Sequence, residues 1–204
     1  MVRVRENSKE FGACSRVNKV FREALHSFYS GIKFPDFHSR LMGLLTRLKD
    51  LDEVGRRGER SVSEGIKKPA GMQLLRQFDY TPACSVHKVF PFPFEVDPES
   101  FELDFADFDI GKVRFVEGAN CIELNYGLLN FNFETLEYSL HRIEPVLLKK
   151  DFERGKLKLT PGAIPEGHGI LMAILGVRYY QEINGETYVL NSKNAVGISV
   201  LGVF

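Results

Sequence analysis

The sequence has no tryptophan and only three cysteines among its 204 residues. Cys14, Cys84 and Cys121 are widely spaced and odd in number, and no CxxC or CxxH pair occurs, which argues against a zinc site. Free thiols in such positions fit a reducing compartment. The absence of tryptophan also removes the broad aromatic platform that many sugar-binding sites use, although tyrosine could substitute.

Long hydrophobic runs are missing as well. No stretch of 18 apolar residues occurs, so we expect no membrane span. The longest apolar run, GILMAILGV at 169–177, has the length of a strand. The N-terminal MVRVRENSKEFG lacks an apolar core, so we expect no secretory signal peptide. We therefore expect a protein that is cytoplasmic or assembled into a larger particle.

The net charge of the whole chain is zero, but each half carries a net charge. Residues 1–88 carry 17 Lys and Arg against 10 Asp and Glu, a net +7, and residues 89–204 carry the opposite, −7. Such asymmetry has two interpretations. The first is a basic arm that binds nucleic acid or an acidic partner, and the second is that the two halves attract one another, within a chain or between copies. The second interpretation is favoured, because the cations are spaced singly along helical faces.

The N-terminal half has helical spacing. After a polar leading arm at 1–14, apolar residues recur at helical intervals from Val17 to Phe28, with Ser15 as the expected N-cap and Gly31 as the stop. Ser39 is the expected cap of a second helix with a leucine stripe from 41 to 51. The pattern predicts a helical hairpin over 15–54.

A Gly- and Arg-rich stretch, RRGERSVSEG at 56–65, follows the helices. It lacks the GxxxxGK[ST] pattern of a P-loop and the GxSxG pattern of a nucleophile elbow. We therefore predict a connector over 55–71. Arg56, Arg57 and Arg60 are the predicted interaction residues, because arginine forms forked contacts with carboxylates and the acid-rich segment 95–109 is close in sequence.

From residue 72 onward the hydrophobic period changes to two. Alternation is clear at 101–105, 112–116, 121–127, 129–138 and 155–160. YYQEINGETYVL at 179–190 places Asn184-Gly185, a type I′ turn pair, between strand formers. The sequence thus predicts an α+β protein: a two-helix N-terminal segment followed by an antiparallel, immunoglobulin-like β-sandwich over 72–204.

Several short motifs are distributed along most of the chain. They are Arg5-Glu6-Asn7, Glu10-Phe11-Gly12, Ser39-Arg40-Leu41, Arg57-Gly58-Glu59-Arg60 and Tyr180-Gln181-Glu182-Ile183-Asn184-Gly185 with Tyr188 and Leu190. Together they are similar to a family of about 200-residue proteins from Bacteroidota-type bacteria. The segment Gln77-Phe78-Asp79-Tyr80-Thr81 departs from the family's Gly-Phe-Glu-Phe-Asn. The resemblance implies no activity and no catalytic residues.

Candidate chemistry is sparse. Seven acids lie within 95–109, and a calcium site there competes with a charged outer face, but the spacing of DFADFDIG does not fit an EF-hand loop. His168 lies in a flexible turn without an evident partner. The Phe-Pro alternation at 90–94 fits either an exposed aromatic strip or an edge segment that packs its rings inward. We predict no catalytic residue, no metal ligand and no cofactor.

The function that this pattern favours is a non-enzymatic structural or assembly protein. Its expected partner is itself, as a homo-oligomer, or another protein, with no nucleic acid, no membrane span and no small-molecule substrate. One alternative is a nucleic-acid-binding protein that uses the basic N-terminal segment, and another is a hydrolase with an undetected site. Phosphate contacts need clustered cations, whereas those of the N-terminal segment alternate with glutamates.

Overall fold

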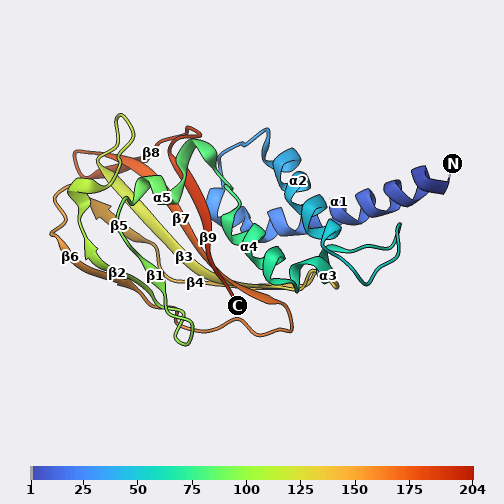
Figure 1. Cartoon of the computed structure of the whole chain (residues 1–204). Coiled ribbons are helices and arrows are strands. Elements are labelled where there is room, and N and C mark those ends of the chain that lie inside the picture. Colours follow the sequence, from blue (N-terminus) through green and yellow to red (C-terminus); the bar gives the residue numbers. More distant parts are fainter. Residues whose placement is uncertain (1) are drawn as a thin grey trace.

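Most of the helices lie toward one end of the molecule and two β-sheets toward the other in the computed structural model, which describes residues 2–204 (Figure 1). The helices are α1 (Val2–Tyr29), α2 (Phe37–Asp50), α3 (Val62–Ile66), α4 (Pro69–Gln77) and α5 (Val86–Val89), with 3₁₀ turns η1 (Pro82–Cys84) and η2 (Ile110–Lys112). The long helix α1 packs along the larger sheet and α2, and its N-terminal turns project from the body (Figure 1). The predicted α+β class, with helices before antiparallel sheets, is confirmed.

The first helix begins earlier than its apolar spacing predicts. The expected leading arm at 1–14 is wrong, because α1 starts at Val2 and Ser15 lies within it instead of capping it. The buried stripe that begins at Val17 continues backward through Cys14 to Glu10. A charged residue in that stripe hid the periodicity from a hydrophobic pattern.

The predicted ends of the other helices are partly corrected. Gly31, at a φ of +83°, follows the end of α1 as expected for a helix stop. The second helix begins at Phe37, so the N-cap position belongs to Asp36 and not to Ser39. The connector predicted over 55–71 holds α3, whose N-cap Ser61 accepts a hydrogen bond from the backbone of Glu64. The predicted sandwich boundary at 72 falls inside α4, and the strands begin only at 95.

The strands form two antiparallel sheets. The smaller has the order β1 (Glu95–Val96), β2 (Leu103–Phe108), β6 (Gly155–Leu159). The larger is built on two long neighbours, β3 (Cys121–Phe131) and β7 (Ile170–Ile183). On the outer side of β3 lie β4 (Tyr138–Arg142) and β5 (Val146–Lys149), and on the outer side of β7 lie β8 (Glu186–Val189) and β9 (Val196–Val203).

Most of the predicted strands are present, with two departures. Asn184 and Gly185 have φ values of 53° and 85°, so the type I′ turn joins β7 to β8 as predicted. The strand predicted at 112–116 is wrong, because the chain there leaves η2 as a loop. Residues 121–131 form one continuous strand rather than two, and the chain turns only after Phe131.

The central strands β3, β7 and β9 of the larger sheet are buried on both faces, which divides the interior into two cores. Leu129 and Phe131 of β3 face the helices, whereas Leu124 and Tyr126 face the smaller sheet. Alternate residues of β7 and β9 divide in the same way. A strand covered on both faces needs no polar alternation, which explains the continuous apolar run at 169–177. The sheets pack as a sandwich, α1 to α4 form a third layer, and α5 packs in the core shared with the smaller sheet.

Candidate functional site

The Arg- and Gly-rich loop at 52–61 folds around the carboxylate of Asp52. One oxygen accepts hydrogen bonds from the backbone of Val54 and Gly55, and the other from the backbone of Ser61, each at 2.8 Å. Burial raises the pKa of Asp52, but these backbone hydrogen bonds outweigh it and the net pKa is lowered. The loop is therefore ordered by its own sequence, as an Asx-type turn.

The loop docks on α1 through a buried ion-pair network. Arg60 forms a forked contact with Glu10, Nε to Oε1 and Nη2 to Oε2, both at 3.0 Å. Lys49 of α2 donates to the same carboxylate at 2.8 Å, and the backbone N–H of Gly58 does so at 2.7 Å. Asp50 completes the network by pairing with Lys49 at 2.6 Å and with Arg60 at 3.2 Å.

Glu10 is ionised in this network despite being only 4% exposed. The hydrogen bond from Arg60 lowers its pKa most, burial opposes it, and Lys49 and Gly58 add to the lowering, so the pKa is about 2. The backbone of Gly58 has a φ of +88°, and a side chain there would meet Glu6 at about 2.9 Å. Glycine at 58 thus permits the close approach of the loop to α1.

The three predicted interaction residues differ in their surroundings. Arg60 is held as described, and Arg57 lies 3.5 Å from the carboxylate of Glu6 and 3.4 Å from the amide oxygen of Asn7. Arg56 forms no side-chain hydrogen bond or ion pair within residues 2–204. The loop therefore contacts α1 and not the acidic segment 95–109, with which docking was expected. Nothing in the sequence of the loop indicated that its arginines would contact α1 instead of the acid-rich segment 95–109.

The acidic segment 95–109 is paired with basic side chains other than those of the loop. Lys158 of β6 pairs with Glu102 and Asp104, and Arg154 forms a forked contact with Asp107 at 2.9 and 2.7 Å. Within residues 2–204, no three His, Cys, Asp or Glu side chains gather closely enough to hold a metal ion. The acids thus form a charged outer face on β1 and β2.

The other candidate residues are scattered. His168 lines a separate hollow of about 300 Å³ with Ser63 and Glu134, and no hydrogen bond joins the three side chains in the described part of the chain. Ser63 instead lies 3.0 Å from Ser61. All three cysteines are buried as free thiols. The rings of Phe90 and Phe92 pack with those of β2, so these two rings face inward and do not form an exposed recognition strip.

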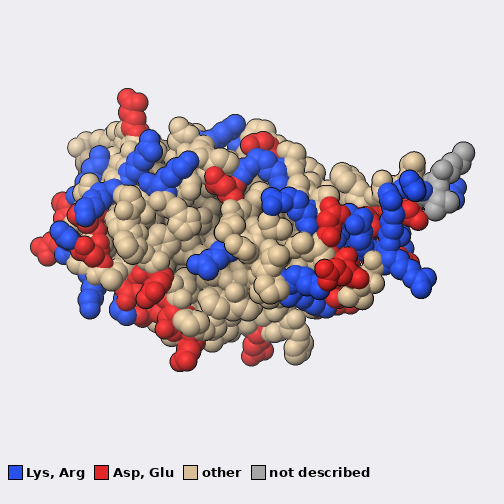
Figure 2. All heavy atoms as spheres, viewed as in Figure 1, with Lys and Arg blue, Asp and Glu red and all other residues tan. Residues whose placement is uncertain are grey.

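The projecting end of α1 is an exposed surface of mixed character. Val4 and Phe11 are 71% and 62% exposed, and their spacing of seven residues places them on one stripe of the helix. Arg3 and Arg5 on the same turns form no ion pair within residues 2–204. Figure 2 shows Lys and Arg predominating at this end, whereas Asp and Glu gather, with Lys and Arg among them, at the opposite end around β2 and β6.

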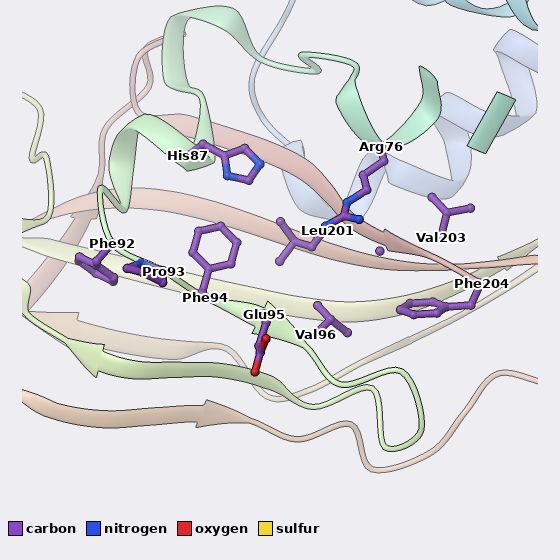
Figure 3. Close-up of a pocket in the computed structure, with 11 residues that line it drawn as sticks. Arg76, His87, Phe92, Pro93, Phe94, Glu95, Val96, Leu201, Val203 and Phe204 are labelled. Carbon is purple, nitrogen blue, oxygen red and sulfur yellow. The ribbon is translucent and has the colours of Figure 1, made fainter. Parts of the chain in front are cut away.

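A second candidate surface is a groove of about 440 Å³ between β1, β9 and the helices α4 and α5. Its lining residues are Arg76, His87, Phe92, Pro93, Phe94, Glu95, Val96, Leu201, Gly202, Val203 and Phe204. Figure 3 shows Phe94 and Leu201 turned into the groove, with the guanidinium group of Arg76 pointing toward Leu201. The ring of His87 stacks on the ring of Phe94 with centroids 5.3 Å apart, and this contact fixes the position of the Phe94 ring.

Comparisons with family models, with curated proteins and with solved structures found no match. No helix among residues 2–204 is long and apolar enough to cross a membrane.

Proposed function

We propose that the protein is a non-enzymatic assembly protein whose projecting α1 end contacts a second copy of the chain. The observation that carries the proposal is the exposed pair Val4 and Phe11 on a helix that leaves the body. Exposed apolar side chains rimmed by charge are typical of protein-interaction surfaces. The network around Glu10 supports this role, because it fixes the helix to α2 and to the loop at a position between Val4 and Phe11.

Charge complementarity favours a head-to-tail contact between copies. Arg3, Arg5 and Arg56 at the projecting end lack ion-pair partners within residues 2–204, and so do Asp151 and Glu153 in the turn before β6. A contact between opposite ends of identical chains is heterologous, so it generates rings or open filaments. Such assembly into a larger particle fits the division of charge between the halves.

The test is light scattering coupled to size-exclusion chromatography, at low and high salt. The average mass of the wild type is expected to rise with protein concentration at low salt. Val4→Asp combined with Phe11→Asp is expected to hold the chain as a monomer, whereas Ile164→Asp, an exposed apolar residue elsewhere, leaves assembly unchanged.

A wild-type chain that stays monomeric at every concentration contradicts the proposal. Binding of generic DNA or RNA that is lost when Arg3 and Arg5 become Glu would instead support the nucleic-acid alternative. The immunoglobulin-like description of the sandwich and the resemblance to the bacterial family stay predictions, and the proposal depends on neither.

A further inference from the structure

The outer edge of β9 lacks a strand partner among residues 2–204. At its end Phe204 and Leu171 exchange both backbone hydrogen bonds, at 2.8 and 3.2 Å. Successive residues of an antiparallel strand direct their N–H and C=O groups to opposite edges. The backbone groups of Val203 therefore point away from β7, toward the groove that Val203 lines.

The rest of this edge is closed, which limits the free stretch. Thr81 Oγ accepts a hydrogen bond from the backbone of Ile198 at 2.8 Å and so caps the edge where η1 approaches it. The open part runs from Leu201 to Phe204, beside the groove. An unpaired strand edge of this kind is a template for another extended chain.

We propose that this groove binds an extended peptide segment bearing an acidic side chain, which adds to the outer edge of β9. The N–H and C=O of Val203 supply the backbone pairing that an extended peptide requires. Phe94, Val96 and Leu201 form an apolar pocket for one of its side chains. Arg76 forms no ion pair within the described chain, and its forked guanidinium group is suited to a carboxylate.

Glu95, which also lines the groove, does not occupy the guanidinium group of Arg76. Glu95 lies between Phe94 and Val96, and alternate side chains of an extended segment point to opposite faces. Figure 3 shows the Glu95 carboxylate directed away from Arg76. Arg76 is thus the charged group that faces a peptide in the groove, and the peptide's acid is expected to lie next to it.

The experiment selects peptides from a random decapeptide library displayed on phage, using the full chain as bait. Enriched peptides are then synthesised, and their binding is measured by fluorescence anisotropy. We expect them to carry Asp or Glu among strand-forming residues and to bind Arg76→Glu at least about tenfold more weakly, since a charge-assisted contact is lost. Arg47→Glu makes the same charge change on α2 and is expected to bind like the wild type.

The pairing of the peptide with the edge of β9 is tested by a separate variant. Val203→Pro removes the outward N–H without removing a hydrogen bond to β7, so it is expected to weaken binding while the chain stays folded by circular dichroism. Should that variant fail to fold, N-methylation of alternate peptide amides gives the same test on the wild-type chain. The proposal is overturned if no enriched peptide distinguishes wild type from Arg76→Glu, or if binding is unchanged by N-methylation in both registers.

Discussion

Two forked arginine–carboxylate pairs of nearly equal geometry lie in different regions of the molecule. Arg60 and Glu10 join the loop to α1 through N···O distances of 3.0 Å, and Arg154 and Asp107 join the turn before β6 to β2 at 2.9 and 2.7 Å. The Glu10 side chain is 4% exposed, whereas Asp107 and Arg154 are about 60% exposed. Burial rather than geometry therefore decides what each pair does for the fold.

The contrast extends to what surrounds each pair. Glu10 also receives Lys49 and the backbone of Gly58, so removing any one partner leaves a buried charge with fewer donors. Asp107 is exposed to solvent, so when Arg154 is removed water molecules replace the guanidinium group as hydrogen-bond donors and little stability is lost. The helical end is thus expected to be the more sensitive to loss of charge.

The largest expected effect comes from Arg60→Ala. Glu10 would stay buried with Lys49 and the Gly58 N–H as its remaining donors. Breaking a buried pair costs about 3–5 kcal/mol of the free energy of unfolding, and because these donors remain we expect a loss near the lower end of that range. Urea denaturation followed by circular dichroism measures the loss. Arg56→Ala, in the same loop but without an ion pair, is the matched control and should keep the wild-type midpoint. Equal midpoints for all three proteins would show that the network contributes nothing to stability.

Acid titration separates Glu10 from the exposed acids. The folded pKa of about 2 lies below the ordinary value of 4.5, so the ionised group stabilises the fold above about pH 4.5, and this stabilisation is lost as the pH falls toward 2. The shift corresponds to roughly 3 kcal/mol of free energy. Glu10→Gln should flatten the pH dependence of unfolding in this window. An unchanged slope in the variant would contradict the assignment to Glu10.

The smallest effect is expected for Arg154→Ala, which completes the comparison. The exposed fork to Asp107 should contribute so little that the urea midpoint stays within experimental error. A loss comparable to that of Arg60→Ala would mean that fork geometry matters more than burial.

Local features of the fold were predictable because they depend on neighbours in the chain. The positive φ values at Asn184 and Gly185 and the alternation at 155–159 follow from the conformational preferences of those residues. The start of α1 was not predictable in this way, because Glu10 is buried only where Arg60, fifty residues later, supplies a counter-charge. A hydrophobic pattern assigns such a residue to the surface.

The sequence by itself determined the order of elements, helices before antiparallel strands, and the presence of three arginines in the loop at 52–61. Only the tertiary structure decided that Arg57 and Arg60 contact α1, that segment 95–109 is partnered by β6, and that the edge of β9 stays open beside Arg76. The physical reason is that periodicity and turn preference act between near neighbours. Charge pairing and edge exposure depend instead on which distant surfaces packing brings together.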